Sequence, residues 1–134
     1  MSSEELKDLS KAEWKVMKIV WDLQKGMARE IYTVAGEQFA WTPATVKTML
    51  KRLVDKGYVS TTAVGNGFVY RPAQSALSAL QSAADSLFTN AVASATGPLL
   101  AHLVEQAPLS EDDLDSLQKL IDSKKKALKA LKRK

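Results

Sequence analysis

The stretch WTPATVKTMLKRLVDKGYVS, Trp41 to Ser60, decides the fold because it holds a complete amphipathic helix followed by the start of a strand. A threonine is a good N-cap, and the proline after it loses nothing at the first helical position, where its N–H would have no partner. The KG pair should end the helix near Lys56. Three apolar residues recur at helical spacing and predict the side that faces a core: Val46, Leu50 and Leu53.

The opposite face of this helix is small at its beginning and basic further on. Hydroxyl and methyl groups allow close approach to base edges, and basic side chains can reach bases or phosphates. The helix N-terminus also favours phosphate. A solvated polar face is the usual fate of such charges, so this segment alone leaves both interpretations open. The residues of this face are Thr42, Ala44, Thr45, Lys47, Thr48, Lys51 and Arg52.

The flanking segments complete a recognisable unit. Upstream, the SKAE sequence at 10–13 predicts a capping box and a helix over about 11–24 that Gly26 ends, followed by a shorter helix over about 28–38. Downstream, β-rich runs on either side of Gly65-Asn66-Gly67 predict a hairpin closed by Pro72. Three helices and a hairpin predict a winged helix-turn-helix over residues 1–72, whose third helix enters the major groove and whose hairpin is the wing.

Residues 73–134 differ in kind and predict a helical region. An Ala/Ser/Leu-rich helix over about 75–95 should break at Thr96-Gly97-Pro98, and a final helix should begin at Ser110. Apolar stripes beyond a complete small domain need a cover, and a dimer supplies one; packing within the subunit is the alternative. The residues assigned to dimerisation are Leu77, Leu80, Leu87, Phe88, Leu99, Leu100, Leu103, Leu114 and Leu117, and Ala84, Ala91 and Val92 share the first stripe.

Charge is distributed unevenly along the 134 residues, whose net charge is +4. Residues 1–72 carry eleven Lys/Arg and eight Asp/Glu, residues 73–118 carry six acids and no base, and residues 119–134 carry eight Lys/Arg and one Asp. A basic front and a very basic tail favour a polyanionic partner. The tail itself has two interpretations: a solvated helix end, or extra nonspecific affinity for DNA phosphates.

Several classes of function find no support in the sequence. The chain has no cysteine, its only histidine, His102, lacks other metal ligands, and the EDDLD run at 111–115 lacks the spacing of a calcium loop, so we predict neither a metal site nor a cofactor. No nucleophile–base pairing or phosphate loop indicates an enzyme or a small-molecule substrate. The polar, acidic N-terminus and the lack of a long apolar run indicate a cytoplasmic protein with no membrane partner.

The motifs LSKAEWKVMKIVW, WTPATVKTMLKRLVDKGYV and GNGFVYRP resemble the BlaI/MecI/CopY family of bacterial transcriptional repressors over roughly residues 9–72. The resemblance implies a homodimer whose winged helices bind the two halves of a palindrome in double-stranded DNA. It carries DNA contacts over to Thr42, Ala44, Lys47, Thr48 and Arg52, and to the wing around Asn66. We add Thr45, Lys51 and the wing residue Arg71 as expected DNA-binding residues.

The second half, with GPLLAHLVEQAPLSEDD, is most similar to the copper-responsive CopY branch. That branch implies operators of the TACA…TGTA type that control copper-export genes. Two family devices are missing here, however. The CxC…CxC cluster of the copper branch is replaced by a lysine-rich tail, and the Asn-Phe cleavage pair of the β-lactam branch is replaced by Ala101-His102. The inducing signal is therefore not predicted.

The sequence thus predicts a mainly α protein with a small β-hairpin that acts as a dimeric repressor on a palindromic operator. Two alternatives remain open. A winged helix can serve as a protein–protein adaptor, and a nucleoid-type protein would bind DNA of any sequence. An adaptor should expose an apolar patch on the third helix, whereas a nucleoid-type protein should bind scrambled duplexes as well as palindromes.

Overall fold

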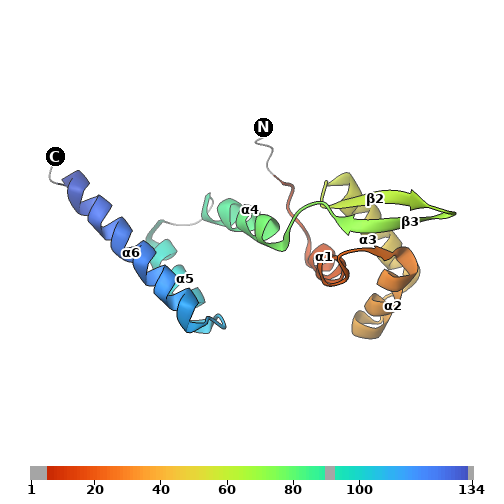
Figure 1. The fold of residues 1–134 in the computed structure, drawn as a ribbon, viewed down its shortest axis with the longest axis horizontal. Coiled ribbons are helices and arrows are strands. Elements are labelled where there is room, and N and C mark those ends of the chain that lie inside the picture. The colour runs from red at the N-terminus through yellow and green to blue at the C-terminus, as the bar shows by residue number, and fades with distance from the viewer. Residues whose placement is uncertain (1–5, 90–92, 133–134) are drawn as a thin grey trace. The chain divides into compact units, whose positions relative to one another are not determined.

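The computed structural model describes residues 6–89 and 93–132 of the chain. Within these ranges the chain forms two compact units that divide after residue 90. The second unit contains helices α5 (Ala93–Gln106) and α6 (Glu111–Lys132). The first contains α1 (Lys11–Leu23), α2 (Ala28–Phe39), α3 (Pro43–Asp55), β2 (Val59–Val64), β3 (Gly67–Pro72) and α4 (Ala76–Thr89) (Figure 1). It also contains the two-residue strand β1 (Gly26–Met27) between α1 and α2.

Local capping explains where the first three helices begin. The predicted capping box of α1 is present: the Glu13 N–H donates to Ser10 Oγ at 3.2 Å, and the Ser10 N–H donates to Glu13 Oε1 at 2.8 Å. The α2 helix begins without a good N-cap side chain, and Glu30 Oε1 instead accepts from the Met27 N–H at 3.0 Å. The cap of α3 is Thr42, as predicted.

The helix ends use left-handed backbone. The α1 helix ends at Leu23, and Gln24 takes φ 63°. The prediction that Gly26 ends this helix is therefore wrong, since Gly26 opens strand β1. Gly57 has φ 84° after α3, which a glycine adopts without a Cβ clash, so the predicted stop after Lys56 is confirmed.

The core of the first unit lies where α1, α2 and α3 meet the base of the sheet. Burial of each large apolar side chain in it contributes about 1.5–3 kcal/mol relative to exposure. Trp14 and Trp21 pack against this core from α1, as core packing of that face requires. The fully buried apolar residues are Val16, Met17, Ile19, Val20, Ile31, Ala35, Val46, Leu50, Leu53, Tyr58, Val59 and Ala79.

The sheet has three antiparallel strands in the order β1-β3-β2. The predicted hairpin is confirmed, with Val64 paired to Gly67 at its tip and Val59 paired to Pro72 at its base. Strand β1 was not predicted. It pairs Gly26 with Tyr70 and Met27 with Val69, and so it ties the α1–α2 connection to the wing.

The α4 helix lies with the first unit. The Trp21 indole N–H donates to the Gln74 carbonyl at 2.8 Å just before the helix begins, and Ala79 is buried in the core. The compact first unit therefore extends past residue 72, where the sequence placed a boundary. A common dimerisation role for residues 73–134 stays a prediction.

The predicted helix break at Thr96-Gly97-Pro98 is wrong. The α4 helix ends at Thr89, and α5 runs through Pro98 from Ala93 to Gln106. Pro98 is the sixth residue of α5, so the helix continues although the proline lacks the N–H that would bond to the Ser94 carbonyl and its ring crowds that carbonyl. Ala91 and Val92, which the sequence placed on the α4 stripe, lie outside the described residues.

Candidate DNA-binding surface

Helix α3 has one buried face and one open face. Its core-facing residues Val46, Leu50 and Leu53 are each at most 1% exposed, as the spacing predicted. All seven residues of the predicted DNA face are exposed: Thr42, Ala44, Thr45, Lys47, Thr48, Lys51 and Arg52. The half-buried Met49 lies between the two faces. The exposed side of α3 therefore shows no apolar patch of the kind that an adaptor would use.

Two threonines organise the beginning of α3. The Thr45 N–H donates to Thr42 Oγ1 at 3.3 Å, and the two hydroxyl oxygens lie 3.1 Å apart. This cap satisfies one N–H of the first turn and leaves the positive end of the helix dipole facing solvent. A phosphate oxygen is the natural ligand for such an end.

The Thr48 hydroxyl is already oriented within the helix. It donates to the Ala44 carbonyl at 3.1 Å, so its proton is engaged while its lone pairs stay available. In this rotamer Thr48 can accept from the amino group of an adenine or a cytosine, or contact a thymine methyl. The Thr48 hydroxyl can donate to a base only after it rotates away from the Ala44 carbonyl.

Basic side chains follow the threonines along the same face. The ion pair found in the described part of the chain joins Lys56 to Glu13, and Lys47, Lys51 and Arg52 have no carboxylate within 4.0 Å in that part. Three cations without intramolecular partners on one exposed helix face can approach a phosphate backbone without first breaking a contact.

The two predicted wing residues lie at different points of the hairpin. Asn66 is exposed in the turn between β2 and β3, whereas Arg71 pairs with Ser60 near the base. Five residues along a strand span roughly 16 Å, so one contact point cannot include both. An Arg71 Nη1 also lies 3.4 Å from Thr62 Oγ1, across the two strands.

A lysine that the sequence did not single out adjoins the start of α3. Lys15 Nζ, from α1, lies 5.1 Å from the ring centroid of Phe39 and 5.9 Å from that of Trp41. The two rings are themselves 5.0 Å apart and flank Ala40, which takes a left-handed φ of 57°. The cation–π contact holds the α2–α3 turn against α1 and thereby orients the N-terminus of α3. No local pattern could have linked position 15 to this turn.

A buried carboxylate holds the other end of α3. Glu13 is 2% exposed, and its Oε1 accepts from Lys56 Nζ at 2.8 Å, while Lys56 Nζ also donates to the Asp8 carbonyl at 2.8 Å. Burial by itself would raise the pKa of Glu13, but the hydrogen bonds from Lys56 and Ser10 and the Lys56 charge hold it below its ordinary 4.5. Glu13 is therefore ionised at neutral pH and fixes α3 against α1.

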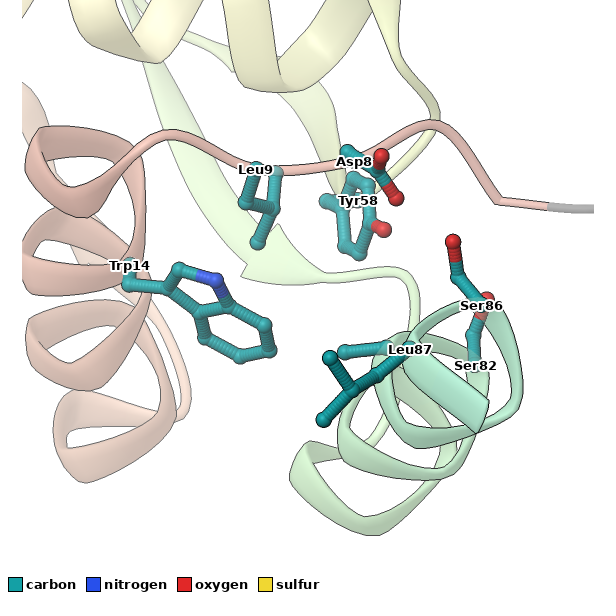
Figure 2. Close-up of a pocket in the computed structure, with 8 residues that line it drawn as sticks. Asp8, Leu9, Trp14, Tyr58, Ser82, Ser86 and Leu87 are labelled. Carbon is teal, nitrogen blue, oxygen red and sulfur yellow. The ribbon is translucent and has the colours of Figure 1, made fainter. Parts of the chain in front are cut away.

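A cleft of about 380 Å³ lies in the first unit away from the α3 face. Figure 2 shows Trp14, Leu9 and Leu87 around it, with Asp8, Tyr58 and two α4 serines on its polar side. The Tyr58 hydroxyl already donates to the Lys7 carbonyl. Burial, followed by the charges of Asp8 and Glu13, raises the pKa of Tyr58 above 10.0, so this hydroxyl stays a donor. These groups do not converge on one point, and we assign the cleft no ligand.

The predicted dimerisation residues fall in both units. On α4, Leu77, Leu80 and Leu87 are exposed by 56–65%, and Phe88 is half-buried. In the second unit, Leu100, Leu103 and Leu114 are exposed by 45–49%, and Leu99 and Leu117 are half-buried. Water covers much of this apolar area in the single chain.

Known proteins resemble this chain in sequence over most of its length. The model of the family described as "Penicillinase repressor" matches residues 9–123. The chain belongs to the penicillinase repressor family. A 16.5 kDa uncharacterised protein from the ptsI 3′ region of Latilactobacillus sakei is 33% identical over 91% of this chain and 84% of its own length. The methicillin resistance regulatory protein MecI of Staphylococcus aureus is 25% identical over 87% of this chain and 95% of its own length.

A solved structure supports the same assignment. The DNA-binding domain of the repressor BlaI is 32% identical, covers 55% of this chain and 89% of that domain, and superposes with a TM-score of 0.51. The predicted family and the winged-helix fold are therefore confirmed. The penicillinase repressors are transcriptional repressors and not enzymes, which confirms the non-enzymatic, DNA-binding class predicted from the sequence.

Within residues 6–89 and 93–132, no three His, Asp or Glu side chains gather as ligands for a metal ion. Over the same ranges, every helix is too short or too polar to span a membrane.

Proposed function

We propose that this chain represses transcription as a homodimer that binds a palindromic operator in double-stranded DNA. The observation that carries the proposal is the division of α3 into a buried apolar face and an exposed face. The exposed face carries seven small or basic residues, and its three cations have no competing ion pair within the described chain. Small and basic side chains on an exposed helix face have the chemistry of a helix that enters the major groove.

Each part of the surface then has its own role. Thr48 and Ala44 contact base edges, where short side chains permit close approach. Lys47, Lys51 and Arg52 contact bases or phosphates, and the α3 N-terminus receives a phosphate. The wing contacts the DNA backbone through the turn at Asn66. Arg71 reaches a separate phosphate from the base of the hairpin.

We infer a second copy of the chain as the partner from two-fold symmetry. We infer the operator type from the resemblance of the second half of the sequence to the copper-responsive branch. The exposed leucines of α4, α5 and α6 support a two-fold interface, and a dimer with two-fold symmetry matches two operator half-sites. We propose an operator of the TACA…TGTA type, upstream of copper-homeostasis genes. Because the chain has no cysteine, any copper signal reaches it by a route other than a cysteine cluster. Binding of an operator that overlaps a promoter would block polymerase sterically.

Fluorescence-anisotropy titration of the full chain on two labelled duplexes tests the proposal. One duplex carries the TACA…TGTA palindrome, and the other carries the same bases scrambled, both at physiological salt. We expect the palindrome to bind about 10³-fold more tightly, in the range of specific regulators. Equal binding would favour a nucleoid-type protein, and binding to neither duplex would favour an adaptor.

A further inference from the structure

The lysine-rich tail is helical as far as Lys132 in this structure. It continues α6 without a break from Glu111 to Lys132, as a single 22-residue helix (Figure 1). No residue of this described helix is buried. An isolated helix with an uncovered apolar stripe is marginal in water, so its stripe requires a cover.

The apolar stripe of α6 has the spacing of a coiled coil and runs through the tail. Its positions alternate by three and four residues over 18 residues, which is the heptad pattern of an a/d seam. The seam side chains remain open: Leu114, Ile121, Leu128 and Leu131 are exposed by 45%, 48%, 56% and 68%, and Leu117 is half-buried. The remaining seam position is Lys124, whose aliphatic stem can line the seam while its ammonium group reaches water.

Charge is segregated along the same helix. Residues 111–118 carry four acids and no base, and residues 124–132 carry five lysines and no acid. The helix dipole accounts for charges in the first and last turns only. Lys124, Lys125 and Lys126 lie well before the last turn, so the dipole does not explain the whole pattern.

We propose that α6 pairs antiparallel with α6 of a second copy of this chain, with the acidic half of each helix against the lysine-rich half of the other. In this arrangement a seam positions face d positions: Leu114 faces Leu131, and Leu117 faces Leu128. Ile121 then faces Lys124 beside the two-fold axis. A parallel pair would place acids beside acids and lysines beside lysines.

The flanking positions agree with the antiparallel register. Glu111 of one copy comes opposite Lys132 of the other, and Gln118 comes opposite Lys125. Leu120, 58% exposed, comes opposite Ala127 and extends the apolar contact. The tail is thus the cationic arm of a helix pair and not primarily a DNA-binding element. This inference rests on the proposed homodimer and specifies one of its contacts.

Because the chain has no natural cysteine, crosslinking can determine the orientation directly. Leu114→Cys and Leu131→Cys are introduced into separate full-length chains and treated with a short bis-maleimide, alone and after mixing. Antiparallel pairing predicts crosslinked dimers in the mixture and few in either single variant. Efficient crosslinking of each single variant with itself would overturn the proposal, as would a lack of crosslinks in all three samples.

A charge exchange separates pairing from simple helix stability. Glu111→Lys and Lys132→Glu should each weaken self-association several-fold in sedimentation experiments, and the double variant should recover it, because opposite charges face each other again. If only the helix dipole matters, the double variant should be the weakest and the least helical by circular dichroism, which would overturn the proposal. Palindrome preference is measured alongside. A dimer that keeps this preference without antiparallel crosslinks would refute this inference alone, whereas loss of all preference in the unaltered chain would refute the proposed function.

Discussion

Helices α3 and α6 both carry an apolar stripe flanked by charge, yet the fold treats them differently. The stripe of α3 is covered by α1 and α2, and Val46, Leu50 and Leu53 are buried completely. The stripe of α6 has no buried residue. In α3 the stripe fixes the helix so that its polar face stays open, whereas in the proposed dimer the stripe of α6 is the surface for a second copy of the chain. In that proposed dimer the same periodicity serves stability in one helix and association in the other.

Truncation of one leucine in each helix should show the largest difference. Leu50→Ala creates a cavity in the core and should lower the free energy of unfolding of the first unit by about 2–5 kcal/mol. Leu128→Ala should leave that unit unchanged, because Leu128 lies in the second unit and is 56% exposed. All three tryptophans lie in the first unit, so denaturation followed by tryptophan fluorescence reports on it selectively. Equal losses in both variants would contradict this contrast.

Thr48→Ala tests whether the open face of α3 reads sequence. Its loss should weaken operator binding by about 1–3 kcal/mol and relax the preference at one base pair, while binding to scrambled DNA stays constant. Anisotropy titrations on both duplexes measure this difference, with Ser123→Ala on α6 as the control that should change neither. Similar losses on both duplexes would remove Thr48 from base contact.

Glu13→Gln tests how firmly α3 is held. Replacing the buried carboxylate should destabilise the first unit by about 1–2 kcal/mol at pH 7, because the ion pair with Lys56 is lost and the Ser10 N–H donates to a neutral oxygen. Since folding lowers the pKa of Glu13, its contribution is complete above the ordinary 4.5 and is lost as pH falls through the folded value. The two proteins should therefore converge in stability in acid. A constant gap from pH 7 to pH 3 would assign the effect to packing.

Arg52→Ala and Lys126→Ala compare the basic surfaces of α3 and α6. Their effects on DNA binding should be the smallest in this series. Arg52→Ala should weaken binding to operator and scrambled DNA alike and reduce the salt slope by about one if it holds a phosphate. Lys126 lies on α6 away from the seam, and its loss should leave the slope unchanged. A reduced slope for Lys126→Ala would assign the tail to DNA.

Features that depend on neighbours in sequence were predictable. The Thr42 cap, the stop at Gly57, the core side of α3 and the hairpin turn all follow from residues within a few positions of one another. The exposure of the predicted DNA face of α3 was also predictable, because this face lies opposite the side that packs in the core.

Features that depend on distant neighbours were not predictable. Strand β1 has two residues, too few for any period, and forms only because β3 offers it an edge. The contact of Lys15 with Phe39 and Trp41 joins α1 to a turn more than twenty residues away. Helix α5 continues through Pro98 although the local Thr-Gly-Pro sequence indicates a break.

Backbone amide NMR can test directly whether the open face of α3, and not the lysine-rich α6, contacts DNA. The isotopically labelled full chain is titrated with the palindromic duplex, and chemical-shift changes are assigned by residue. We expect the largest changes between Ala44 and Arg52 and at the Gly65–Gly67 turn, with little change over residues 119–132. Changes concentrated in α6, with α3 unaffected, would contradict this expectation.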